Sequence, residues 1–139
     1  MPLRIAKDFR EIEKMILFVY GSLKRGRSNH RRIADQQYLG EAVTEPRYRL
    51  IDLGTYPGMV RDDMNGVAVK GELWEVGPRC LAELDEFEKA DAPYFRGAVA
   101  VAGREGVEAY FWHGPVPAGT RSGDEWPLPS AERGARDAE

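Results

Sequence analysis

An uninterrupted apolar run at residues 15–20 ends abruptly at Gly21, and the chain then turns polar. Successive bulky, β-branched and aromatic residues with no polar position between them are typical of a strand that is covered on both faces. We therefore expect this run to form a buried central strand. The end of that strand, and the loop that follows it, should lie inside the molecule.

Shorter strands are predicted along the rest of the chain. Residues 67–76 alternate between apolar and polar side chains, and residues 94–101 and 107–112 are expected to form a hairpin. Residues 42–58 are expected to hold two short strands and a turn. Many short strands beside one main helix indicate an α+β fold built as a small mixed β-barrel.

The main helix is predicted over residues 78–88. Pro78 suits the first turn of a helix and Gly77 is an acceptable cap. Pro93 ends the helix, because the residue before a proline avoids helical angles. At about 100° per residue, the apolar residues of this segment share one face. They are Cys80, Leu81, Leu84 and Phe87.

Glu88 lies within roughly 50° of the centre of that face, whereas the neighbouring acids are expected to point to the sides or the back. Those acids are Glu83, Asp85 and Glu86. Desolvation raises the pKa of a carboxyl that faces the interior, and this suits the carboxyl for proton transfer. The alternative is a frayed helix end with Glu88 in solvent, because a sequence defines helix ends only to within one or two residues.

The loop after the first strand is a candidate anion site. Gly21 can adopt backbone angles closed to other residues, and the N–H groups of Gly21, Ser22 and Leu23 can converge on an anion. Lys24 and Arg25 add positive charge beside these groups. The alternative is a strand end followed by an ordinary turn, because so short a motif does not identify a ligand site by itself.

Composition limits the classes to which this protein can belong. Its 139 residues suit one domain, and a formal net charge of −3 lacks the basic excess of a typical nucleic-acid binder. Cys80 is the only cysteine, so no internal disulfide forms, which fits a reducing compartment. The two histidines, His30 and His113, belong to no cluster with ligand spacing. We therefore predict no metal site and no histidine-based triad.

The domain is expected to span residues 15–128, between two less regular ends. Residues 1–14 form an N-terminal extension with apolar residues at helical spacing, which is an added helix, a disordered leader or an artefact of the chosen start codon. Residues 129–139 have the composition of a flexible tail. The charged N-terminus is unlike a signal peptide, and no apolar stretch is long enough to span a membrane, so the cytoplasm is the expected location.

Six short motifs, in their order and spacing, resemble the γ-glutamylcyclotransferase-like superfamily, and within it most closely the γ-glutamylamine cyclotransferases. They are Phe18-Val-Tyr-Gly-Ser-Leu-Lys-Arg-Gly26, Asn29-His30, Tyr56-Pro57, Gly71-Glu-Leu-Trp-Glu-Val76, Leu84-Asp-Glu-Phe-Glu88 and Tyr94-Phe-Arg96. Each motif is short, but their combination is specific. The resemblance extends from about residue 15 to residue 126.

This resemblance implies a β-barrel flanked by helices and an enzyme that needs no cofactor. In that family a Tyr-Gly-(Ser or Thr)-Leu loop binds the substrate, and the last glutamate of a Leu-Asp-x-Phe-Glu run accepts a proton. The matching positions are Tyr20, Gly21, Ser22 and Leu23 for substrate binding and Glu88 for catalysis. The implied reaction is attack of the α-amine of a γ-glutamyl amide on its own γ-carbonyl, which releases 5-oxoproline and a free amine. Tyr94 and Arg96 stay outside the predicted catalytic set.

Three alternatives stay open at the level of sequence. The substrate can be another γ-glutamyl compound, because the leaving group lies outside the loop that binds the glutamyl part. The fold can be catalytically silent and bind a small metabolite or a partner. Nucleic-acid binding through the basic residues 24–32 is disfavoured by the negative net charge and by the lack of aromatic residues in that segment. The sequence leaves the oligomeric state open.

Overall fold

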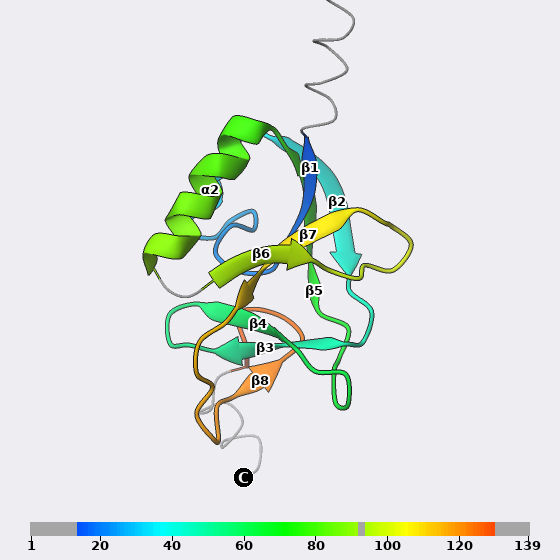
Figure 1. Cartoon of the computed structure of the whole chain (residues 1–139), viewed down its shortest axis with the longest axis vertical. Helices are drawn as coiled ribbons and strands as arrows, with labels where there is room; N and C mark the ends of the chain where they lie inside the picture. The colour runs from blue at the N-terminus through cyan, green and yellow to red at the C-terminus, as the bar shows by residue number, and fades with distance from the viewer. Residues whose placement is uncertain (1–13, 92–93, 130–139) are drawn as a thin grey trace, which may run out of the picture.

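The computed structural model of the chain describes residues 14–91 and 94–129 (Figure 1). The predicted N-terminal helix, the predicted helix end at Pro93 and the tail beyond residue 129 lie outside the described residues. In the part that is described, eight strands form two sheets, and the α-helix α2 (Pro78–Asp91) covers one face of the larger sheet. No helix among the described residues has the length and hydropathy needed to cross a membrane.

The larger sheet has five strands with β1 at its centre. Their order is β2 (Gln37–Val43), β5 (Lys70–Val76), β1 (Met15–Val19), β7 (Val107–Trp112) and β6 (Tyr94–Ala98). β1 pairs antiparallel with β5 and parallel with β7. The predictions of a buried central strand and of a hairpin, now seen as β6 and β7, are confirmed.

β1 is buried because its successive side chains enter two different cores. Leu17 and Val19 pack in a cluster with Leu84 of α2, whereas Phe18 packs in a second cluster with Leu50 of the smaller sheet. A strand that is covered in this way needs an apolar side chain at every position. This explains why its sequence shows no alternation of polar and apolar residues.

The smaller sheet consists of β4 (Pro57–Arg61), β3 (Tyr48–Asp52) and β8 (Ser122–Gly123), in that order. The prediction of a closed β-barrel is wrong, because the described strands form two separate open sheets. β8 is too short to complete a ladder, since it pairs with β3 through two residues. The pattern of apolar residues predicts strands but not their partners, so it does not determine closure.

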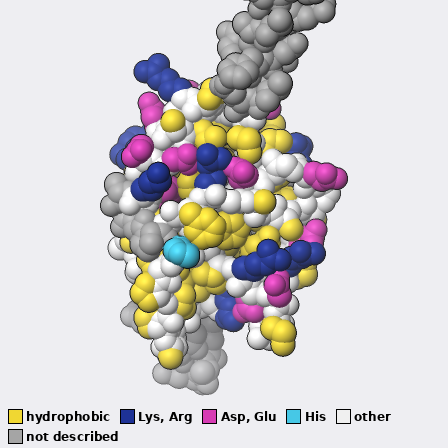
Figure 2. All heavy atoms as spheres, viewed as in Figure 1, with side chains coloured by type: hydrophobic (Ala, Val, Ile, Leu, Met, Phe, Trp, Pro, Cys, Tyr) yellow, Lys and Arg dark blue, Asp and Glu magenta, His cyan; other side chains and the backbone are white. Residues whose placement is uncertain are grey.

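The surface has a mixed character. On the face shown in Figure 2, lysine, arginine, aspartate and glutamate side chains are interspersed, with hydrophobic side chains between them. Interspersed charges of both signs are typical of an ordinary solvated surface.

Candidate functional site

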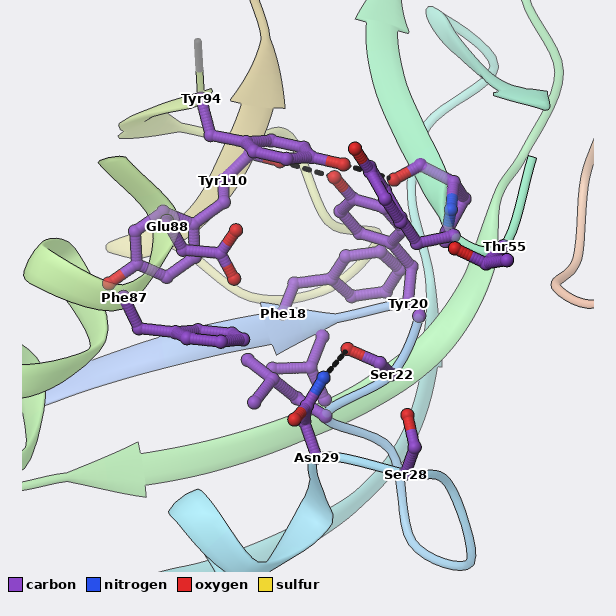
Figure 3. A pocket seen from close by; sticks show the side chains of 15 residues that line it. Phe18, Tyr20, Ser22, Ser28, Asn29, Thr55, Phe87, Glu88, Tyr94 and Tyr110 are labelled. Carbon is purple, nitrogen blue, oxygen red and sulfur yellow. Dashed lines mark hydrogen bonds between the residues drawn. The ribbon is translucent and has the colours of Figure 1, made fainter. Parts of the chain in front are cut away.

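A cavity of about 410 Å³ lies where the end of β1, α2 and the two sheets meet (Figure 3). Its walls come from the loop after β1, from the residues that enter β4, from α2 and from β6 and β7. All five predicted site residues line it, namely Tyr20, Gly21, Ser22, Leu23 and Glu88. The fold therefore brings together the two stretches that the sequence analysis singled out.

Glu88 lies within α2, which continues to Asp91, so it is not at a frayed helix end. Its side chain is partly buried, and Figure 3 shows the carboxylate directed into the cavity. Phe87 lines the cavity beside it, and the guanidinium carbon of Arg32 lies 3.7 Å from the centre of the Phe87 ring. The predicted apolar face of the helix is confirmed at its buried members Cys80, Leu81 and Leu84.

Asp85, which was expected to point to the side or back of the helix, contacts the sheet from the side of α2, and this contact was not predicted. Its Oδ1 accepts hydrogen bonds from the Tyr110 hydroxyl at 2.7 Å and from Arg96 Nε at 2.9 Å. Burial by itself raises the pKa of Asp85, but the hydrogen bonds from Arg96 and Tyr110 outweigh it and hold the pKa below its ordinary value. Arg96 also pairs with Glu108, so its side chain is bound within the protein.

Tyr20 forms part of the cavity wall and joins the two sheets. Its hydroxyl donates to the Tyr110 carbonyl of β7 at 2.6 Å and accepts from the Met59 N–H of β4 at 3.2 Å. The side chain is buried, and burial, followed by the nearby Tyr94 and Glu88, raises its pKa well above 10.0. The hydroxyl therefore stays protonated at neutral pH, with its proton engaged by Tyr110.

Gly21 is needed for close packing. The described glycines with positive φ, such as Gly26 at 81°, do not include Gly21, so the expectation of an unusual backbone angle is not met. A Cβ at this position would lie 2.8 Å from Pro57 Cγ and 3.0 Å from Pro57 Cδ. The close approach of Gly21 to Pro57 places the loop after β1 against the start of β4, and both segments line the cavity.

Gly21→Ala is expected to lower the free energy of unfolding by about 1–3 kcal/mol, because the added methyl group overpacks a contact with a rigid proline ring. Gly97→Ala is the matched control, since its Cβ would meet its nearest neighbour, Phe95 Cε2, at an ordinary 3.5 Å. Denaturant-induced unfolding of the two variants measures the difference. Equal free energies of unfolding for the two variants would show that Pro57 can shift to accommodate the added methyl group without destabilising the fold.

Ser22 and Asn29 form a polar pair in the cavity wall (Figure 3). Asn29 Nδ2 donates to Ser22 Oγ at 2.9 Å, and the Asn29 N–H donates to the Ser22 carbonyl at 2.9 Å. A hydroxyl oxygen that accepts a hydrogen bond can still donate its own proton to a ligand. Asn29 belongs to one of the six motifs, but no role was predicted for it, and its nearness to the loop in the sequence was the only local signal.

The loop itself is a tight turn over residues 21–24. The Lys24 N–H donates to the Gly21 carbonyl at 3.1 Å. Leu23 is buried, and its carbonyl lies 3.0 Å from His30 Nδ1 at the start of the short 3₁₀ helix η1 (His30–Arg32). The His30 ring in turn contacts Trp74 edge to face, with ring centres 5.2 Å apart. These contacts hold the turn against the sheet.

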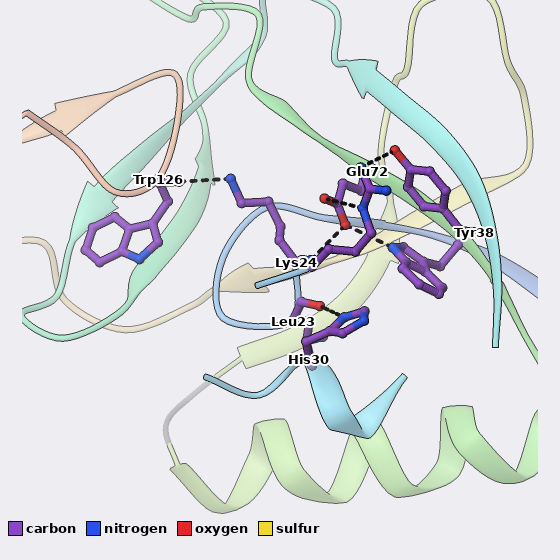
Figure 4. A network of polar contacts seen from close by, with 8 residues as sticks. Leu23, Lys24, His30, Tyr38, Glu72 and Trp126 are labelled. Carbon is purple, nitrogen blue, oxygen red and sulfur yellow. Dashed lines mark hydrogen bonds and ion pairs between the residues drawn. The ribbon is translucent and has the colours of Figure 1, made fainter. Parts of the chain in front are cut away.

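Lys24 and Arg25 were expected to add positive charge beside the turn, but neither lines the cavity, and Figure 4 shows the Lys24 side chain directed to Trp126. Lys24 Nζ donates to the Trp126 carbonyl at 2.8 Å. The N–H and Nε of Arg25 donate to the two carboxylate oxygens of Glu72 at 3.1 and 3.3 Å. Glu72 is 8% exposed and also accepts a bond from the Trp74 indole at 3.1 Å. Both basic side chains therefore anchor the loop.

The cavity lining is mostly uncharged. Among the described residues that line it, Glu88 is the only one with an acidic or basic side chain. Tyr94, from β6, also lines the cavity, and its hydroxyl donates to the Pro57 carbonyl at 2.6 Å. An anionic group of a ligand would therefore meet neutral N–H and O–H donors.

Comparison with known proteins gives the family that the motifs resemble. A model of the family described as gamma-glutamyl cyclotransferase, AIG2-like, matches residues 17–128. A Vibrio cholerae protein provisionally named gamma-glutamylcyclotransferase is 40% identical over 84 residues, which cover 60% of this chain and 70% of the relative. The gamma-glutamylaminecyclotransferase of Rattus norvegicus is 35% identical over 92 residues, which cover 61% of this chain and 62% of the relative.

A solved structure agrees on the fold. The crystal structure of an AIG2-like protein from Mus musculus has a TM-score of 0.70 with 24% identity and covers 87% of this chain and 93% of its own. At this identity the likeness shows the fold alone. The sequence relatives carry the names of cyclising enzymes, although the aligned region is less than two thirds of the rat protein. Because the family model matches most of the length of this chain, the chain belongs to the gamma-glutamyl cyclotransferase, AIG2-like family.

Proposed function

We propose that this chain is a γ-glutamyl cyclotransferase-type enzyme that converts a γ-glutamyl amide to 5-oxoproline and a free amine. The α-amine nitrogen of the substrate attacks its own γ-carbonyl carbon and closes a five-membered ring. The amide C–N bond then breaks, and the amine that was attached leaves with a proton. Water is not a reactant, so the cavity has to hold a single molecule in a folded conformation.

Glu88 is the proposed proton carrier. The α-amine is protonated at neutral pH and must lose a proton before it attacks, and the leaving nitrogen must gain one. One carboxylate that faces the cavity can accept the proton from the α-amine and then deliver a proton to the leaving nitrogen. Tyr20 is poorly suited to this task, because its raised pKa and its bond to the Tyr110 carbonyl keep its proton in place.

The turn of residues 21–24 is the proposed clamp for the glutamyl part of the substrate. Backbone N–H groups of Gly21, Ser22 and Leu23, together with the Ser22 hydroxyl, offer neutral donors for the α-carboxylate. Asn29 orients Ser22 through the bond to its Oγ. Holding the nucleophile and electrophile of one molecule in a reactive geometry can lower the barrier by on the order of several kcal/mol.

The observation that carries this proposal is that Glu88 and the turn line one cavity from different walls. The cavity volume of about 410 Å³ falls within the range of about 300–1,000 Å³ that is typical of small-molecule sites. A γ-glutamyl group held at the turn would present its reacting atoms toward the helix that carries Glu88.

The purified chain should be incubated with a panel of γ-glutamyl amides and γ-glutamyl amino acids, and the products identified by mass spectrometry. We expect at least one compound to yield 5-oxoproline and the free amine in equal amounts, with no glutamate. Formation of glutamate would indicate hydrolysis and contradict the cyclisation. Binding of these compounds without turnover would favour the catalytically silent alternative.

A further inference from the structure

A network of four side chains lies beside Glu88, where α2 meets β6 and β7. Arg96 of β6 donates to both oxygens of Asp85, from Nε to Oδ1 at 2.9 Å and from Nη2 to Oδ2 at 3.0 Å. Its Nη1 donates to Glu108 of β7. Tyr110, also on β7, donates to Asp85 Oδ1 at 2.7 Å. Each nitrogen of the Arg96 guanidinium is thus directed to Asp85 or Glu108.

Arg96 and Glu88 line the same small cavity of about 230 Å³, which shares Glu88, Tyr94 and Tyr110 with the candidate substrate cavity. Among the described residues, the charged and titratable side chains that line these two cavities with Glu88 are Asp85 and Lys89 of its own helix, Tyr94 and Arg96 of β6, Tyr110 of β7, Tyr20 at the end of β1 and Tyr56 before β4. Of the two cations, Lys89 is exposed, whereas the Arg96 side chain is 27% exposed. Arg96 is therefore the cation that solvent screens less.

A guanidinium bound to Glu88 would oppose proton transfer. An opposite charge within hydrogen-bonding reach lowers the pKa of a carboxyl by about 1–3 pKa units. A carboxylate with so low a pKa is a poor base toward an ammonium group. Asp85 lies one helical turn before Glu88, so the two side chains are neighbours on α2 and can compete for the same cation.

We propose that Asp85 is a positioning residue that holds the guanidinium of Arg96 away from Glu88, so that Glu88 acts as a base instead of pairing with this arginine. Glu108 shares the task from β7, and Tyr110 fixes the orientation of the Asp85 carboxylate. The inference rests on the proposed role of Glu88 in proton transfer. It gives a function to the aspartate in the motif of residues 84–88.

The test is the pKa of Glu88, measured by NMR in protein with ¹³C-labelled glutamate side chains, the Glu88 signal being assigned from its absence in Glu88→Gln. Asp85→Asn preserves the shape of the side chain but removes the charge that binds Arg96. We expect the pKa of Glu88 to fall by about 1–3 pKa units in this variant. At neutral pH, kcat for 5-oxoproline release should fall while KM stays nearly constant.

Arg96→Met distinguishes the effect of Asp85 on the position of Arg96 from the direct effect of the Asp85 charge on the pKa of Glu88. Without a guanidinium to move, Asp85→Asn should lower the pKa of Glu88 by clearly less than it does when Arg96 is present. An equal shift in both backgrounds would overturn the proposal, because Asp85 would then act through its own charge alone. Glu86→Gln is the matched control, since it removes the same charge from an exposed position of α2 and should leave the pKa of Glu88 nearly unchanged.

Glu108→Gln provides a second route if Asp85→Asn does not fold. It removes the other carboxylate that binds Arg96, from β7 instead of α2. A smaller fall in the pKa of Glu88 is expected, and no fall would overturn the proposal. Because the NMR measurement needs no turnover, a shifted pKa without enzyme activity would refute the proposed function alone. An active enzyme whose Glu88 pKa stays constant in these variants would refute the role of Asp85 alone.

Discussion

Glu88→Gln is expected to fold like the wild type and to release 5-oxoproline about 10²–10⁴ times more slowly, which is the usual contribution of a positioned acid–base group. Glutamine matches the shape of glutamate but does not take up a proton from the substrate amine. The Glu88 side chain is partly exposed in the cavity wall, so the loss of its charge should cost little stability. The rate is measured as kcat with a substrate from the panel, and circular dichroism during heating checks the fold.

Glu86→Gln is the control for this variant. It makes the same chemical change at an exposed position of the same helix and should retain wild-type activity. Full activity of Glu88→Gln would refute the role of Glu88 as proton carrier. An equal loss in both variants would point to a general effect on the helix.

Tyr20→Phe is expected to lower the free energy of unfolding by about 1–3 kcal/mol for each buried backbone group that it leaves without a partner. The groups are the Tyr110 carbonyl and the Met59 N–H, one in each sheet, and phenylalanine fills the space without bonding to either. Denaturant-induced unfolding measures the loss. Tyr38→Phe is the matched control, because the Tyr38 hydroxyl accepts its bond from Arg25 where water can replace it.

Tyr20→Phe should also change how the free energy of unfolding depends on pH in alkaline solution. Burial raises the pKa of Tyr20 above the value of 10.0 that it has in the unfolded chain. The stabilisation is therefore complete below pH 10 and is lost as the pH rises toward the folded pKa, because only the unfolded state releases the proton in that interval. The free energy of unfolding should fall less steeply above pH 10 in Tyr20→Phe, and identical slopes would contradict the burial of this hydroxyl.

Local periodicity predicted the features of the site that depend on one element at a time. The rotation of a helix placed Glu88 toward the interior, and the unbroken apolar run identified β1, because both depend on neighbours in sequence. The same reasoning placed Asp85 at the side or back of the helix but did not predict its contacts. Its partners Arg96 and Tyr110 come from β6 and β7, which reach past the apolar face of α2 and meet a residue on its side.

The remaining differences also come from contacts between distant segments. Gly21 needs its small size because the Pro57 ring packs directly against it, and no residue near Gly21 in the sequence indicates this contact. Glu72 sits at a polar position of an alternating strand, and it is buried because Arg25 and Trp74 bind it. Closure of the sheets likewise depends on which strands pair, and this information is not contained in any single strand.

The bond from Lys24 to the Trp126 carbonyl joins positions 102 residues apart. One side of the turn that faces the cavity is thus tied to the segment that follows β8. During synthesis on a ribosome, the turn emerges early, whereas its anchor emerges only after nearly all of the domain has been made. A nascent chain would therefore contain the residues of the pocket long before it can hold them in their final arrangement.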